Sequence, residues 1–323
     1  MGIGNKNLKW ERTLSANLGL DLTMFKGRWD FSADVYVKNT DNLLLDITKA
    51  PSLGITTSRE NVGEVENHGF EFQTRVIPIK NKDWEWSLSL NYAYNKNKIK
   101  KISNALREQN EKNQAKGGVT PLPIYEEGQS LTALKVVSSA GIDPITGNEV
   151  FIKRDGSLTF VYDPNDKVVY GDTTPFGMGS IGSYLTYKQF SMGMSMRYSF
   201  GGAVYNQTLA SKVEGADPRY NADERVFSSR WKEVGQQAKY KRISDSSVPM
   251  QTSRFVETNN YITLSSLSLA YEVPLTFIKR YGLKRLHLEM LANDLFYLSS
   301  VKRERGLSYP YERSVEFSVR LGF

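Results

Sequence analysis

The chain has 323 residues, carries a formal net charge of +7 and contains no cysteine. The lack of cysteine excludes disulfides, thiolate nucleophiles and cysteine metal ligands. Lysine and arginine are spread along the chain without a dense tract, which favours a solvated surface over nucleic-acid binding. There is no run of 18 apolar residues that would predict a transmembrane helix, and residues 1–6 lack the apolar core of a signal peptide.

Alternation of apolar and polar side chains is the main pattern of the chain, and it is typical of strands whose two faces meet different surroundings. It predicts strands at 13–24, 28–38, 69–79, 84–95, 181–187, 190–200, 261–271, 285–296 and 314–323. A weaker pattern predicts two more strands at 131–138 and 150–153, and a short surface helix within 99–116. The alternation changes phase after Leu264, which indicates a β-bulge near Ser265.

The last strand has the most regular alternation of all. One side carries Val315, Phe317, Val319, Leu321 and Phe323. Glu316 and Arg320 lie on the other side. We expect the apolar side to face lipid and the two charged side chains to face a polar lumen.

The strands need a partner for their continuous apolar faces, and no helical pattern is long enough to cover them. A soluble protein would pack sheet on sheet, whereas a membrane barrel would face lipid. The predicted connections favour lipid: those at 25–27, 80–83, 188–189 and 273–284 are short or moderate, and they alternate with long ones at 39–68, 96–179, 201–258 and 299–312. Short periplasmic turns alternating with long extracellular loops are typical of antiparallel outer-membrane barrels.

Aromatic residues near the short turns support the same interpretation. We expect an interfacial belt that consists of Trp29, Trp84, Trp86, Tyr187, Tyr271 and Phe323. Such belts mark the boundary between lipid and water.

The number of strands predicts that the barrel is partial. If the last strand descends to the periplasm, counting back makes the first strand descend as well, so the total is odd: nine, or eleven with the weak pair. A complete bacterial barrel has an even number of strands, and an open edge in lipid leaves backbone groups without partners. We therefore expect residues 1–323 to be one part of a larger all-β barrel.

Few residues suggest chemistry. His68 and His287 belong to different strands, and we expect both to be surface groups and not metal ligands. The segments 143–144 and 163–166 lack calcium-loop spacing and are predicted to be turns. There is no nucleophile–base pair and no phosphate loop, so we expect neither an enzyme nor a bound cofactor.

Two motifs and several landmarks resemble the C-terminal barrel half of SusC/RagA-like TonB-dependent transporters. Asn7-Leu8-Lys9-Trp10-Glu11 is similar to the entry segment of that family. The more specific signature consists of Asn61, Gly63, Asn67, Gly69 and Glu71. Its asparagines and glycines are expected to shape a turn and the start of a strand. Further landmarks are 140–147, 170–175, 261–274 and 292–296.

The resemblance implies an outer-membrane barrel of about 22 strands in a Gram-negative bacterium. Its implied role is the import of glycan or oligosaccharide, or of peptide fragments. The implied partners are a SusD-like lipoprotein, TonB, membrane lipid and the upstream half of the barrel with its plug domain, which this sequence lacks. Phe323 then fits the terminal signal for insertion of such barrels, together with Phe317, Val319 and Leu321.

Substrate contacts are expected in the long loops, where aromatic rings could stack on sugars. The candidates are Tyr220, Phe227 and Trp231. Two alternatives remain open at this point: a passive porin, and a surface-exposed adhesin or binding barrel.

Overall fold

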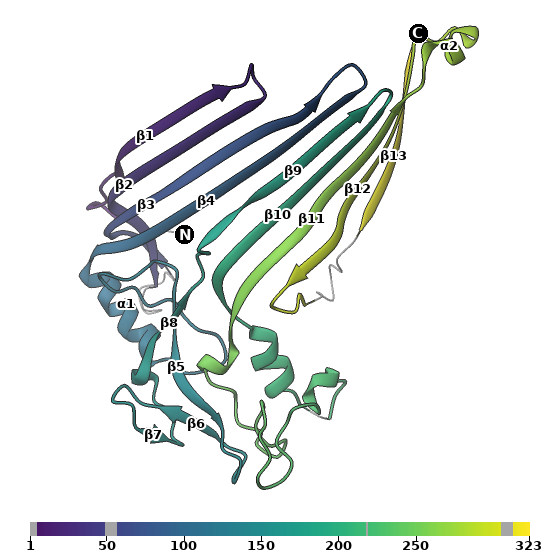
Figure 1. Ribbon diagram of the computed structural model, residues 1–323. Helices are drawn as coiled ribbons and strands as arrows, with labels where there is room; N and C mark the ends of the chain where they lie inside the picture. The colour runs from purple at the N-terminus through teal and green to yellow at the C-terminus, as the bar shows by residue number, and fades with distance from the viewer. Residues whose placement is uncertain (1–4, 49–56, 218, 305–312) are drawn as a thin grey trace.

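The computed structural model describes residues 5–48, 57–217, 219–304 and 313–323, and its main feature is a nine-stranded sheet. Every neighbouring pair of strands in this sheet is antiparallel, and the strands follow one another in chain order. They are β1 (Arg12–Met24), β2 (Trp29–Thr48), β3 (Thr57–Lys80), β4 (Trp84–Ile102), β9 (Gly177–Tyr187), β10 (Phe190–Tyr205), β11 (Val256–Glu272), β12 (Arg285–Ser299) and β13 (Ser314–Gly322). Strands β1 and β13 form the two edges of the sheet, which is not closed (Figure 1).

Tight turns lie at one end of the sheet. At the other end lies a separate lobe, which consists of the segments between β4 and β9 and between β10 and β11 (Figure 1). The turn between β1 and β2 uses three residues with positive φ, Phe25, Lys26 and Gly27. Lys188 has a φ of 52° in the turn between β9 and β10. The connection from β11 to β12 carries α2 (Leu275–Ile278) and η6 (Lys279–Tyr281). Strand β3 ends at Lys80 and β4 begins at Trp84, so their connection is also tight. All four connections that were predicted to be short or moderate are confirmed.

The pairing register confirms the expected aromatic belt for three of its members. Trp84 pairs with Tyr187, Tyr187 with Phe190, and Phe190 with Tyr271, so the rings form one row across four strands. The Trp84 and Tyr187 ring centroids are 4.1 Å apart. The predicted bulge is also present, because the register of β10 and β11 shifts around Ser265.

The apolar face of the sheet is exposed over its whole width. Its exposed side chains include Leu18, Val35, Phe70, Phe190, Phe317 and Val319. The opposite face carries polar pairs between neighbouring strands, such as Asn17 with Asp34 and Arg320 with Glu289. No helix among the described residues has the length and apolar composition needed to span a membrane.

Two of the predicted long loops are shorter than expected, and that part of the prediction was wrong. Strands β2 and β3 continue as a paired ladder to Thr48 and Thr57, so most of the segment 39–68 is strand. Strands β10 and β11 likewise extend into 201–258, to Tyr205 and Val256. Beyond the membrane no face of a strand has to be apolar over its whole length, so the ladder continues without a regular alternating pattern. The predicted connection at 299–312 lies largely outside the described residues.

The weak strand pair is present, but it does not belong to the main sheet. A second, four-stranded sheet consists of β7 (Leu158–Thr159), β6 (Glu149–Ile152), β5 (Ala133–Ile142) and β8 (Lys167–Asp172). It belongs to the lobe (Figure 1). The main sheet therefore has nine strands and not eleven, and the count is odd as predicted.

Short helices complete the lobe. The predicted surface helix is α1 (Asn104–Ala115), which begins at Ser103, whose hydroxyl accepts a hydrogen bond from the Leu106 amide. Leu106 packs against Ile47 and Val62 and so joins the helix to β2 and β3. The other helical turns are η2 (Pro164–Asp166), the π-helix η3 (Leu209–Glu214), η4 (Glu224–Val226) and η5 (Ser253–Phe255).

Candidate functional site

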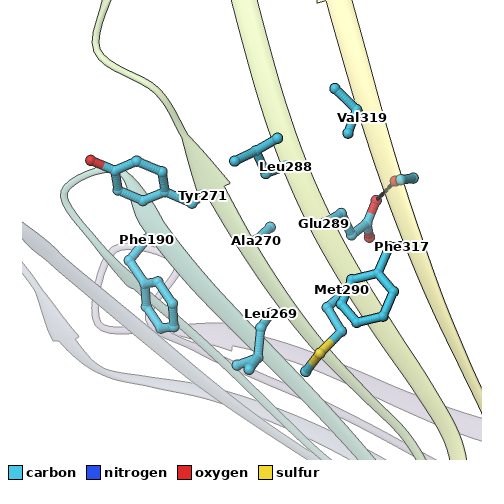
Figure 2. Close-up of a pocket in the computed structure, with 10 residues that line it drawn as sticks. Phe190, Leu269, Ala270, Tyr271, Leu288, Glu289, Met290, Phe317 and Val319 are labelled. Carbon is cyan, nitrogen blue, oxygen red and sulfur yellow. Dashed lines mark hydrogen bonds between the residues drawn. The ribbon is translucent and has the colours of Figure 1, made fainter.

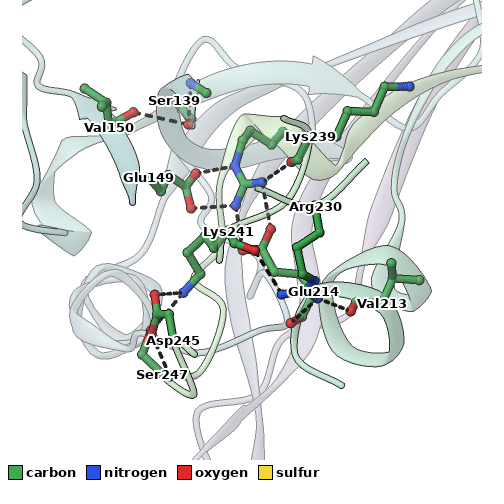
Figure 3. Close-up of polar contacts among 12 residues, drawn as sticks. Ser139, Glu149, Val150, Val213, Glu214, Arg230, Lys239, Lys241, Asp245 and Ser247 are labelled. Atoms are coloured by element: carbon green, nitrogen blue, oxygen red, sulfur yellow. Dashed lines mark hydrogen bonds and ion pairs between the residues drawn. The ribbon is translucent and has the colours of Figure 1, made fainter. Parts of the chain in front are cut away.

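The lobe is built from the segments between β4 and β9 and between β10 and β11, so one part of the chain must be held against the other. Arg254 provides the central contact. Its guanidinium donates to both carboxylate oxygens of Glu149 at 2.8 Å and to those of Glu214 at 2.6 and 2.7 Å. The side chain of Arg254 is 10% exposed, and those of Glu149 and Glu214 are 4% and 0% exposed. Figure 3 shows both carboxylates converging from different segments.

A second arginine, Arg230, stabilises the 206–255 segment of the lobe. Arg230 is buried, and its partners among the described residues are all backbone carbonyls, those of Val213, Glu214, Val226 and Lys241. Burial lowers the pKa of Arg230. The four carbonyls belong to three separate turns of the 206–255 segment, so one side chain holds these turns together.

A buried lysine stabilises the helix of the lobe. Lys167 donates from Nζ to the carbonyls of Asn113, Gln114 and Lys116 at the C-terminal end of α1. The last carbonyls of a helix have no partner within the helix and carry partial negative charge, so a cation is favoured there. Burial lowers the pKa of Lys167.

A polar hollow of about 490 Å³ opens beside these contacts. Glu214, Asp217, Arg219, Arg230 and Asp245 are its charged lining residues. Burial favours the neutral form of Asp245, but hydrogen bonds from Lys241 and Ser247 outweigh it and lower the pKa of this carboxyl to about 2. The hollow therefore presents both signs of charge, which suits a polar ligand better than an apolar one.

The three aromatic candidates differ in their surroundings. Tyr220 and Phe227 are 74% and 54% exposed. Trp231 instead donates from Nε1 to the Pro144 carbonyl at 2.9 Å. Its ring lies so close to Gly147 that a Cβ added there would be 2.6 Å from the indole. Tyr220 and Phe227 are free to meet a ligand, while Trp231 supports the 143–148 turn.

The signature residues lie inside β3, so the expected turn is not there. Asn61 holds the N-terminal segment: its Nδ2 donates to the carbonyls of Lys9 at 2.9 Å and Asn42 at 2.8 Å, and its Oδ1 accepts from the Lys9 amide at 2.8 Å. Glu11 accepts a hydrogen bond from the Leu44 amide. The two motifs, 7–11 and 61–71, therefore contact each other.

Both signature glycines are required because the backbone of the neighbouring strand β4 lies too close to allow a Cβ atom. A Cβ on Gly63 would lie 2.0 Å from the Lys101 carbonyl oxygen, and one on Gly69 would lie 2.2 Å from that of Tyr94. Tyr36 crosses over Gly69 and donates to Asn95 at 3.1 Å. Asn67 and Glu71 lie in the β3 ladder, where Asn67 pairs with Lys38 and Asn97, and Glu71 with Asp34 and Ala93.

Replacing Asn61 with Ala should release the N-terminal segment. Three hydrogen bonds disappear, and we expect a loss of about 1–2 kcal/mol in local stability. Hydrogen exchange of residues 5–11 in the full-length protein would measure it. Asn67→Ala is the matched control in the same strand, because its side chain forms no hydrogen bond with a described residue; equal exchange in the two variants would refute the role of Asn61.

The terminal strand contributes to a groove on the apolar face. Phe317 and Val319 line a hollow of about 300 Å³ together with Phe190, Leu269, Leu288 and Met290. Figure 2 shows these side chains on one side of β10 to β13. Leu321 of the same edge strand is 52% exposed, and Phe323, directly after the end of that strand, is 78% exposed. Ser318 instead donates to Glu289, whose carboxylate also accepts from Arg320 at 2.9 Å.

The remaining polar candidates have local roles. Within the described residues no group of His, Asp and Glu has the arrangement of a metal site. The Asp143 carboxylate accepts from the Thr146 amide and hydroxyl, and Asp163 accepts from the Asn165 amide, so both predicted turns are confirmed. His287 Nδ1 lies 2.9 Å from a carboxylate oxygen of Glu272.

Comparison with known proteins agrees with this architecture. The chain is 30% identical to TonB-dependent receptor P3 of Formosa agariphila over 90% of its length, and 31% identical to TonB-dependent receptor SusC of Bacteroides thetaiotaomicron over 65%. It covers 30% and 21% of those proteins. The RagAB peptide transporter has the same fold, with a TM-score of 0.78 and 22% identity over 93% of this chain and 33% of that one.

The chain thus spans about a third or less of the length of the relatives it matches. The model of the family described as TonB dependent receptor-like, beta-barrel, matches residues 1–289. With its open antiparallel sheet, apolar outer face and SusC-like and RagA-like relatives, this chain belongs to the TonB-dependent receptor β-barrel family.

Proposed function

We propose that residues 1–323 form the C-terminal part of the barrel of a TonB-dependent importer of large nutrients in the outer membrane of a Gram-negative bacterium. The open nine-stranded meander carries this proposal. Edge strands β1 and β13 present unpaired backbone groups that lipid cannot satisfy. The missing strands, the plug domain and the TonB contact would come from sequence outside these residues or from a separate chain.

The lobe is the part of the chain that would meet the nutrient and a SusD-like lipoprotein. It lies at the end of the sheet opposite the tight turns, which is the extracellular end in outer-membrane barrels (Figure 1). Its mixed-charge hollow and exposed rings suit either class of large polar nutrient. Tyr220 and Phe227 favour oligosaccharide, since flat rings stack on sugar faces, whereas similarity to the RagAB peptide transporter favours peptide fragments.

Growth of the native bacterium separates these possibilities. A strain lacking the gene should fail on one nutrient class, defined oligosaccharides or defined peptides, as its only carbon source. Deleting tonB should give the same defect, and deleting a neighbouring SusD-like gene should weaken growth at low nutrient concentration. Growth that needs the gene but not tonB would contradict the importer and indicate a passive porin, and unchanged growth with lost surface attachment would indicate an adhesin.

The exposed rings give a residue-level prediction. In the full-length transporter, Tyr220→Ala combined with Phe227→Ala should weaken nutrient binding roughly tenfold, because each lost ring contact is worth about 0.5–1.5 kcal/mol. Isothermal titration with the nutrient identified by growth would measure it. Tyr170, 51% exposed on β8 of the lobe, offers a control in Tyr170→Ala; unchanged affinity in the double variant would remove both rings from the site.

A further inference from the structure

The outward face of the sheet changes from apolar to basic at one level of β3 and β4. On this face Phe70 pairs with Tyr94. Moving away from the tight turns, the next pair, Gly69 with Asn95, belongs to the opposite face, and the pair after it, His68 with Lys96, is again on the outward face. A transmembrane strand needs about 9–11 residues to cross the hydrocarbon. The stretch of β4 from Trp84 to Tyr94 has this length, so Lys96 lies at the level of the extracellular headgroups.

Two hollows meet at this level. An apolar groove of about 490 Å³ runs over β1 to β4, and its lining includes Leu18, Val35, Val37, Phe70 and Tyr94. A polar hollow of about 470 Å³ adjoins it, with Lys96, Lys98 and Lys100 in its lining. His68 lines both. A ligand that fits both hollows has an apolar tail and a polar head.

The charges of the polar hollow favour an anion. Lys100 forms an ion pair with Glu66, in which Nζ lies 2.7 Å from a carboxylate oxygen. The other acid of the lining, Asp172, accepts hydrogen bonds from the Thr132 hydroxyl and the Thr174 amide. Lys96 and Lys98 are exposed, and neither forms an ion pair with a described residue. Two ammonium groups are therefore left to meet a phosphate.

We propose that these two hollows bind a phosphorylated lipid of the outer leaflet. An acyl chain would lie in the groove along Leu18, Val35 and Phe70, and a headgroup phosphate would lie between Lys96 and Lys98. Basic residues at a membrane surface attract anionic headgroups. The free-energy cost of moving an acyl chain from the bilayer into the groove is low, because the groove already faces lipid. The inference rests on the outer-membrane location proposed above.

Lipid retention by the full-length transporter would test this inference. The protein is reconstituted in phosphatidylcholine nanodiscs with lipid A as the probe, or with the same lipid after removal of its phosphates, and bound lipid is counted by native mass spectrometry. We expect retention that depends on phosphate. Lys96→Gln with Lys98→Gln should weaken it roughly 30-fold, since each surface lysine contributes about fivefold.

Lys38→Gln is the matched control. Lys38 pairs with Asn67, which pairs with Asn97, so it lies at the same level, and alternation along β2 places it on the polar face. Equal retention by the double variant and the wild type would overturn the site, as would equal retention of the dephosphorylated lipid. Competition by millimolar inorganic phosphate without any need for the acyl chain would show an anion site and not a lipid site. Because the readout is bound lipid, failure of nutrient transport would not affect it.

Discussion

Replacing Arg254 with Met should open the extracellular lobe while the membrane strands stay folded. Glu149 and Glu214 would remain buried without their shared partner, and removing one member of a buried ion network costs about 3–5 kcal/mol. Arg254 holds segments that lie far apart in sequence, 139–152 and 206–255. We therefore expect faster hydrogen exchange and easier proteolysis in these two segments.

A charge-free triple variant provides the control. Combining Arg254→Met with Glu149→Gln and Glu214→Gln keeps the side-chain volumes but leaves no buried charge in the network. Replacing a whole buried ion network is often neutral, so protection of the lobe should largely return. If the single and triple variants exchange at the same rate, packing and not charge holds the lobe together.

The pH dependence of the lobe should follow Asp245. Its pKa in the folded protein is about 2, below the usual value near 3.9 for an unfolded aspartate. The ionised form is favoured by folding, so this contribution is fully present above pH 4 and is lost as the pH falls toward 2. Hydrogen exchange of residues 241–247 measured between pH 5 and pH 2.5 would show it, and Asp245→Asn should abolish the trend.

The strands within lipid could be predicted because lipid imposes one apolar face. Residues 190–200 alternate without interruption, and β10 begins at Phe190 as expected. The extensions could not be predicted, because beyond the membrane neither face must be apolar. In β3 the segment Thr57–Asn67 carries polar residues on both faces, yet its backbone is paired with β2.

The lobe was less accessible from sequence because its contacts are not local. Glu149 and Arg254 are 105 residues apart, and no periodic pattern relates them. Trp231 shows the same limit: as a loop aromatic it resembled Tyr220, but its indole is held by Pro144 and rests on Gly147. The one available signal was the 140–147 landmark, because Gly147 leaves room for the indole ring of Trp231.

An arginine on the apolar face in the middle of a strand should destabilise the barrel. Met194 lies near the middle of the stretch from Phe190 to Phe200, and its partners across the sheet are Ser183 and Leu267. A charged residue on the lipid face at the bilayer midplane costs about 2–4 kcal/mol. Met194→Arg in the full-length protein should lower the free energy of unfolding from lipid vesicles by that amount, measured by denaturant titration.

The next residue supplies the matched control, because successive side chains of a strand point to opposite faces. Ser195 pairs with Gly182 and Ser266 on the polar side, where water or the plug can solvate a guanidinium. Ser195→Arg should therefore change the free energy of unfolding far less than Met194→Arg. The reverse order would mean that the apolar face lines the interior of the barrel, and it would remove the lipid site at Lys96 and Lys98 together with the assigned orientation of the sheet.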